Sequence, residues 1–158
     1  MGKDYYSFQN KGYSFIVTNT QLWKIDVEDE SVKHDSWFKE TVQKLSDKQN
    51  PLFVIGHYPL YLETPEEEEI YFNLPPVKRK ELLQLFEQNN VIAYLSGHTH
   101  KTISNTYKNI QLLSGETTSL NFDERPLGFR VWNVSSDTLT HHFVPLQKTS
   151  IYNSTVDN

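Results

Sequence analysis

Short hydrophobic runs alternate with two helix-like repeats along this chain, and their order predicts the fold. The aromatic and β-branched runs 5–10 and 13–19 flank Lys11-Gly12, which predicts a hairpin. Residues 34–47 repeat apolar side chains at intervals of four and three, as an amphipathic helix does. The acidic stretch 25–33 between them is predicted to be a loop.

The middle of the chain is predicted to contain two buried strands separated by a helix. The apolar runs 52–55 and 91–95 are continuous, which is typical of strands that are covered on both faces. The pair Pro75-Pro76 opens a helix that we expect to end near Gln88. Residues 58–74, which precede this helix, show no clear period and form a long connection.

The last third of the chain changes to strands and turns. Four short runs are expected to be strands: 103–107, 110–113, 128–134 and 139–144. The whole order predicts an α/β fold in which a mixed β-sheet is flanked by helices. We assign residues 1–148 to one domain and residues 149–158 to a tail.

Composition narrows the classes of function. Hydrophobic residues make up 37% of the chain and charged residues 22%, which is typical of a folded globular protein. The net charge is −5, and nothing in the sequence indicates the basic surface that nucleic-acid-binding proteins usually have. We therefore expect no nucleic-acid partner. No cysteine is present, which excludes disulfides and thiolate metal sites. The absence of cysteine fits a cytoplasmic location, which we expect. No apolar run has the length of a membrane span, so we expect no membrane association.

The candidate chemistry lies where two predicted strands end in Gly-His. His57 follows the strand 52–55 and His98 follows the strand 91–95, at the sheet edge where open α/β folds bind ligands. His100 stands two residues after His98, so both would face one side of an extended segment. Neutral imidazoles bind zinc, iron and manganese. We predict these three histidines as metal ligands, although a single histidine at a strand end more often has a structural role.

The segments Gly56–Pro59 and Gly97–His100 resemble the fourth and fifth sequence blocks of the calcineurin-like metallophosphoesterases. The likeness covers most of the chain and is greatest to the branch described as serine/threonine phosphatases. It implies half of a four-layer αββα sandwich, a site for two Mn, Fe or Zn ions, and phosphorylated substrates. In that site His57 and His98 would bind one metal, and His100 would bind the other.

Three further sequence blocks of the family are missing from this chain. No aspartate stands two residues before a histidine, and none of the six glycines precedes Asp or Asn. Without a bridging carboxylate, two cations about 3.5–4 Å apart would repel each other. We therefore interpret the chain as the C-terminal part of such a phosphoesterase domain. We expect it to bind at most one metal weakly and to have little activity alone.

Other functions fit the same sequence. The chain could be a non-enzymatic binding or regulatory half-domain, or one half of a split enzyme. In either case we expect it to self-associate or to dock to a missing N-terminal half. A third hypothesis is a mononuclear zinc hydrolase that uses His57, His98 and His100 as its three protein ligands.

Several other polar residues are weaker candidates. Asn73 and Arg130 are predicted as weak substrate contacts, although an ordinary salt bridge is the safer interpretation of the arginine. The run Glu66–Glu69 is read as a solvated loop face, with a rim near His57 as the functional alternative. The cluster Lys78–Lys80 is predicted to lie on the exposed side of its helix. Glu116 follows a strand end and is a marginal candidate near the metal.

Overall fold

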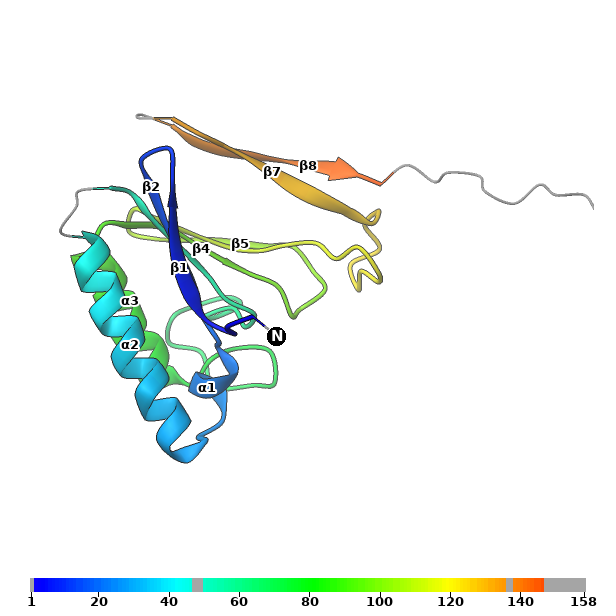
Figure 1. The fold of residues 1–158 in the computed structure, drawn as a ribbon. Coiled ribbons are helices and arrows are strands. Elements are labelled where there is room, and N and C mark those ends of the chain that lie inside the picture. Colours follow the sequence, from blue (N-terminus) through cyan, green and yellow to red (C-terminus); the bar gives the residue numbers. More distant parts are fainter. Residues whose placement is uncertain (1, 47–49, 136–137, 147–158) are drawn as a thin grey trace, which may run out of the picture.

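The structure is a computed structural model that describes residues 2–46, 50–135 and 138–146. Its centre is a six-stranded sheet in the order β1-β2-β3-β4-β6-β5 (Figure 1). The strands are β1 (Tyr6–Asn10), β2 (Tyr13–Val17), β3 (Leu52–Ile55), β4 (Val91–Ser96), β5 (Ile103–Tyr107) and β6 (Ile110–Ser114). The inner strands β2, β3, β4 and β6 are parallel, whereas β1 and β5 pair antiparallel at the two edges. The predicted mixed sheet is therefore confirmed.

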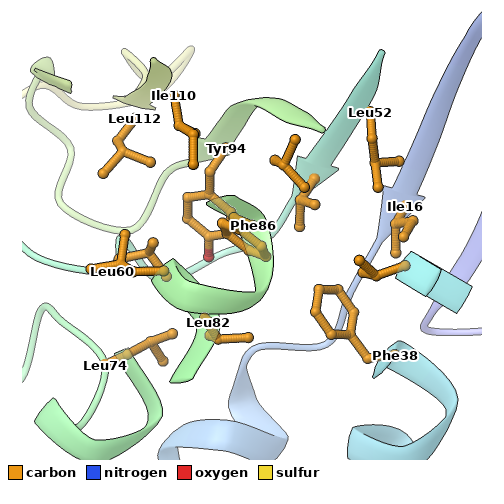
Figure 2. Close-up of a cluster of buried hydrophobic side chains, with 14 of the residues drawn as sticks. Ile16, Phe38, Leu52, Leu60, Leu74, Leu82, Phe86, Tyr94, Ile110 and Leu112 are labelled. Atoms are coloured by element: carbon orange, nitrogen blue, oxygen red, sulfur yellow. The ribbon is translucent and has the colours of Figure 1, made fainter. Parts of the chain in front are cut away.

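Two helices cover one face of this sheet. α2 (Glu28–Ser46) connects β2 to β3, and α3 (Pro76–Gln88) connects β3 to β4 (Figure 1). Because β2, β3 and β4 follow one another in one direction and such crossovers are right-handed, both helices must lie on the same face. In the core between the helices and the sheet, Phe86 of α3 contacts both Phe38 of α2 and Tyr94 of β4 (Figure 2).

The opposite face of the sheet is covered only in part. β7 (Gly128–Val134) and β8 (Leu139–Pro145) form a separate antiparallel pair on that side (Figure 1). A row of aromatic rings runs across this face from β1 to the β7–β8 pair: Phe8, Phe15, Phe53 and Trp132. Phe53 is buried within the row, whereas Phe8 is 44% exposed. The exposed part of this aromatic row therefore lies near the β1 edge.

Two sequence predictions about helices need correction. α1 (Gln21–Lys24) was not predicted, and α2 begins at Glu28 inside the stretch 25–33 that we expected to be a loop. Three consecutive acidic residues occupy the first turn of α2, where they interact favourably with the helix dipole. The predicted end of this helix at Asp47 and the tail 149–158 lie outside the described residues. Within those residues, no helix is both long enough and apolar enough to cross a membrane.

His34 of α2 is fully buried inside an aromatic cage. Its Nε2 atom lies 2.9 Å from the Oγ1 atom of Thr18. The rings of Tyr5, Trp23 and Trp37 surround it at centroid distances of 4.9, 5.0 and 6.2 Å. The Nδ1 atom is buried and has no hydrogen-bond partner among the described residues. Burial lowers the pKa of His34, because a low-dielectric environment disfavours the charged ring.

We expect this histidine to make the fold less stable in acid. The pKa of His34 is lower in the folded chain than its unfolded value of about 6.5, so the unfolded chain takes up the proton first. Its contribution to stability is therefore present above that pH and is lost as the pH falls below it. As the pH falls from about 7.5 to 5.5, the unfolding free energy of the native chain should decrease by up to about 1.4 kcal/mol more than that of His34→Gln.

Urea denaturation at several pH values measures this difference. The control variant His142→Gln removes an exposed histidine from β8 and should keep the pH dependence of the native chain. An unchanged pH dependence in His34→Gln would contradict the prediction.

Candidate metal centre

The two Gly-His segments lie side by side at the carboxyl edge of the parallel strands. β3 and β4 are paired neighbours, and their ladder continues past both strand ends. The N–H group of Gly56 donates to the carbonyl of Leu95 at 2.9 Å, and that of Gly97 donates to the carbonyl of His57 at 3.0 Å. This shared register brings together two histidines that are 41 positions apart: the Nε2 atom of His57 lies 3.1 Å from the Nδ1 atom of His98.

The geometry of this pair fits one cation. With metal–nitrogen bonds of about 2.0–2.1 Å, a nitrogen separation of 3.1 Å corresponds to an angle of roughly 100° at the metal. Tetrahedral and octahedral sites both accommodate such an angle. Burial and the neighbouring His57 lower the pKa of His98, although the backbone of Tyr71 raises it. His98 is therefore mostly neutral at neutral pH, which is the form that binds metals.

His100 does not join the other two histidines. Its Nδ1 atom lies 2.8 Å from the carbonyl oxygen of Leu120, so Nδ1 carries the proton and Nε2 keeps its lone pair. An outer hydrogen bond of this kind usually fixes the orientation of a metal-binding histidine. In the part of the chain that the structure describes, no three potential ligands are grouped closely enough to hold one metal ion. The mononuclear three-histidine site is therefore not assembled.

The turn that carries His98 and His100 has a strained backbone. Their φ angles are 66° and 53°, in the left-handed region that is unfavourable for residues other than glycine. Between them, the buried hydroxyl of Thr99 lies 3.1 Å from that of Ser114, which donates to the carbonyl of Gly97 at 2.7 Å. These hydrogen bonds hold the turn in place. The prediction of an extended segment at this position is therefore wrong.

Thr20 fixes the other histidine turn, and sequence analysis did not identify it. Thr20 follows β2, and its buried Oγ1 atom accepts hydrogen bonds from the N–H groups of His57 at 3.2 Å and Tyr58 at 3.0 Å. From the core, the hydroxyl of Tyr94 donates to the carbonyl of Tyr58 at 2.5 Å. The turn formed by His57 and Tyr58 is thus held from two sides. A threonine after a strand is too common for the sequence alone to reveal this role.

Arg79 organises the long connection between β3 and α3. It was predicted to lie on an exposed helix face, but it is fully buried. Its guanidinium group donates to four backbone carbonyls of this connection at 2.6–2.8 Å: those of Leu60, Pro65, Glu67 and Leu74. The planar fork of an arginine can satisfy several separate carbonyls, which a lysine ammonium group cannot do in the same geometry. One side chain thus holds a connection that has no regular secondary structure.

Glu67 and Asn73 hold the same connection from inside. The carboxylate of Glu67 accepts hydrogen bonds from the backbone N–H groups of residues 62–64, so the acidic run is not simply a solvated face. The amide of Asn73 donates to Glu67 at 2.6 Å, and its oxygen accepts the N–H group of Ile70 at 2.8 Å. Because Asn73 is fully buried, the structure places it in the scaffold of the loop, where it has no exposed atom for the predicted substrate contact.

Arg130 is bound to a carboxylate near the same edge of the sheet. Its Nε atom donates to Glu116 at 3.2 Å, a second hydrogen bond joins the same two side chains, and its Nη1 atom lies 2.8 Å from the Nδ1 atom of His141. Burial raises the pKa of the Glu116 carboxyl group, but the hydrogen bonds from Arg130 hold this pKa below its ordinary value. The guanidinium group that we predicted for a substrate oxygen is thus engaged by Glu116 in this structure.

Gly56 precedes His57 and Gly97 precedes His98, but the two glycines have different surroundings. Their substitution should therefore have different effects. A Cβ atom at Gly56 would lie 2.5 Å from a methyl carbon of Thr20 and 2.6 Å from the hydroxyl oxygen of Tyr94, whereas one at Gly97 would meet no atom within 4 Å. We expect Gly56→Ala to lower the unfolding free energy by about 1–3 kcal/mol and to weaken Mn²⁺ binding about 10-fold. Gly97→Ala is the matched control.

Urea denaturation and titration calorimetry measure these two effects. Equal losses in both variants would mean that the close packing around Gly56 does not position His57.

Arg79→Lys should loosen the connection between β3 and α3. The variant keeps the positive charge but loses several hydrogen bonds to buried carbonyls, so we expect a loss of about 2–4 kcal/mol in unfolding free energy. Limited proteolysis should then cleave within residues 62–74. The control Lys80→Gln changes an exposed neighbour and should stay within about 0.5 kcal/mol of the native chain. Native stability of Arg79→Lys would refute this role.

Comparison with known proteins finds relatives that match nearly the whole of this chain. The human serine/threonine-protein phosphatase CPPED1 is 30% identical over 153 residues, which cover 94% of this chain and 49% of the relative. The CPPED1 protein of Danio rerio is 28% identical over 152 residues, with the same coverage. The chain therefore spans about half the length of the curated relatives it matches.

Solved structures and a family model complete the comparison. A dimetal phosphatase from Danio rerio matches with a TM-score of 0.66 and 11% identity, over 88% of this chain and 57% of that chain. GAP50, described as the anchor in the inner membrane complex of Plasmodium, matches with a TM-score of 0.62 and 17% identity, over 94% and 51%. At such identities these likenesses show the fold alone. The family model described as calcineurin-like phosphoesterase matches residues 1–102, and the chain therefore belongs to the calcineurin-like phosphoesterase family.

Proposed function

We propose that this chain carries part of a metal-dependent site that hydrolyses phosphomonoesters, phosphoproteins among them. The observation that supports this function is the 3.1 Å approach of His57 and His98, which β3 and β4 position at the carboxyl edge of the sheet. Divalent cations of the Mn, Fe or Zn type, when bound, would polarise the phosphoryl oxygens and activate water. His57 and His98 would hold one cation, and His100 would offer its Nε2 atom to the other.

The chain supplies imidazoles for this site but not the carboxylates that two cations need. The sequence contains no Asp-x-His, Gly-Asp or Gly-Asn-His segment. Glu116 lies near the same edge, but its carboxylate is already bound by Arg130. Without an anionic bridge, two divalent cations would repel each other strongly. We therefore propose that this chain alone holds at most one cation weakly and becomes active when a complementary half supplies the carboxylates.

A non-enzymatic half-domain, or one half of a split enzyme, is the second candidate. It is favoured by the β1 edge of the sheet, where all five strand residues are exposed. Tyr6 and Phe8 there are 45% and 44% exposed. An edge strand with apolar side chains is a surface on which another chain, or a second copy of this one, can pair. The shared fold does not discriminate between these functions, because one fold supports many of them.

Metal content and phosphatase activity, measured together, test the leading proposal. After loading with Mn²⁺ or Zn²⁺, we expect about one cation per chain at most and background hydrolysis of p-nitrophenyl phosphate. Adding a complementary half that supplies the missing carboxylates should raise the activity. Two bound cations with rapid turnover in the chain alone would show that other residues complete the site.

The ligand assignment has its own test. His98→Ala should weaken cation binding by about 10-fold or more, because it removes one of two paired imidazoles. Circular dichroism should show an unchanged fold, since the ring lies at the edge of the core. The control His142→Ala removes a histidine from β8. Native cation affinity in His98→Ala would show that this pair is not the metal site.

A further inference from the structure

Aromatic side chains crowd the ring of His98. Tyr58, Tyr71 and Phe72 approach it at centroid distances of 4.2, 5.0 and 5.5 Å. Tyr58 is buried, but Tyr71 is 69% exposed. The ring of Tyr71 therefore rests on a predicted metal ligand with one side and offers much of its remaining surface to solvent.

A second apolar group lies against His100. The ring of Phe122 stacks on that of His100 with a centroid distance of 5.0 Å and an interplanar angle of 20°, and Phe122 is 53% exposed. The N–H group of Phe122 donates to the carbonyl of His100 at 2.8 Å, and the carbonyl of Leu120 accepts from the His100 ring. Leu120 is 57% exposed. The segment that orients His100 thus also presents apolar side chains beside it.

Exposed apolar side chains lie beside both of these histidines. Single exposed apolar residues are common on protein surfaces and need no explanation, whereas a cluster of them indicates a binding site. Four of the twelve large apolar side chains that are exposed among the described residues belong to the two segments that contact the histidines: Ile70, Tyr71, Leu120 and Phe122. A substrate bound at His98 and His100 would therefore lie beside Tyr71 and Phe122.

The segment that carries Tyr71 is held rigidly without any ligand. Arg79, Glu67 and Asn73 fix the connection from inside. The ammonium group of Lys24 donates to the carbonyl of Ile70, next to Tyr71, at 2.6 Å and to that of Asn73 at 2.8 Å. A side chain positioned in advance binds a ligand with a smaller entropic cost than a mobile one. The exposure of Tyr71 is therefore a feature of an ordered wall and not of a loose loop.

We propose that Tyr71 and Phe122 form an aromatic subsite that selects phosphoesters whose phosphate is attached directly to an aryl or other large apolar group. The inference rests on the proposed function, because the cation held by His57 and His98 would anchor the phosphoryl group. The organic group of the ester then lies against Tyr71, where an aromatic ring gains stacking and edge-to-face contacts. Contacts of this kind correspond to about a 2- to 10-fold gain in affinity over a methyl group.

Binding of two phosphonates to the Mn²⁺-loaded chain tests the proposal without requiring turnover. Phenylphosphonate and methylphosphonate share the anionic group and differ in the organic group, so the ratio of their affinities reports the subsite. By titration calorimetry we expect a preference of about 5-fold for phenylphosphonate in the native chain and of about 2-fold or less in Tyr71→Ala. Tyr6→Ala removes a tyrosine that is 45% exposed on β1, and it should keep the native ratio.

The outcomes distinguish a failure of the aromatic subsite from a failure of the metal site. A native chain that binds both phosphonates equally, or a Tyr71→Ala variant that keeps the native ratio, overturns the aromatic subsite and leaves the metal site standing. If neither phosphonate binds in a Mn²⁺-dependent manner, the cation held by His57 and His98 does not anchor the phosphoryl group, and the subsite proposal fails with that anchor. Phe122→Ala provides the same test if Tyr71→Ala does not fold, and it should also lower the ratio.

Discussion

The parallel pairing of β3 with β4 is the constraint on which the candidate site depends. Ile55 lies opposite Leu95, and the ladder continues through the N–H groups of the two glycines that follow. Successive side chains of a strand point to opposite faces, so a slip of one residue would point a histidine away from its partner. The neighbouring strands add further support, since Thr20 after β2 and Ser114 of β6 bind the two turns. Four strands thus determine the distance between two imidazole nitrogens.

Packing and hydrogen bonds of α3 also connect the site to the core. This helix buries Phe86 against the sheet and directs the guanidinium group of Arg79 into the loop that carries Tyr71. Buried polar groups of this kind are stable only when all their hydrogen bonds are formed, so a partly ordered loop would leave several carbonyls unsatisfied. A partly ordered loop beside His98 is therefore disfavoured relative to the ordered one. Packing of α3 stabilises the ordered one.

The charges at this edge of the sheet are the basis for the proposal that another chain completes the site. The histidine rings and exposed aromatic side chains at this edge would bind a cation and an apolar group in the proposed site, but they would not offset the charge of two metals. The buried carboxylate near the same edge, Glu116, already compensates Arg130. A partner half that brings carboxylates would supply what the imidazoles lack. The exposed β1 edge and the aromatic row across the open face of the sheet offer it a surface.

Local patterns in the sequence determined most of the elements and both Gly-His segments. Apolar runs and repeats depend on neighbours within a few residues, so β3, β4 and α3 could be predicted, and so could the positions of His57 and His98 at strand ends. The helical start at Glu28 was missed because the acidic first turn of α2 has the composition of a loop.

The tertiary structure alone decided what the polar residues do. Arg79 and its neighbour Lys80 carry the same charge on the same helix, yet Arg79 is buried and Lys80 is exposed. The side chain of Asn73 is buried in the loop, where it binds Glu67. Of the two glycines that precede a histidine, only Gly56 has close neighbours. A polar side chain takes its role from the partners that satisfy it when it is buried, and most of the partners that decide these roles are distant in sequence. A single sequence does not contain those distances, which are set when the strands and helices pack.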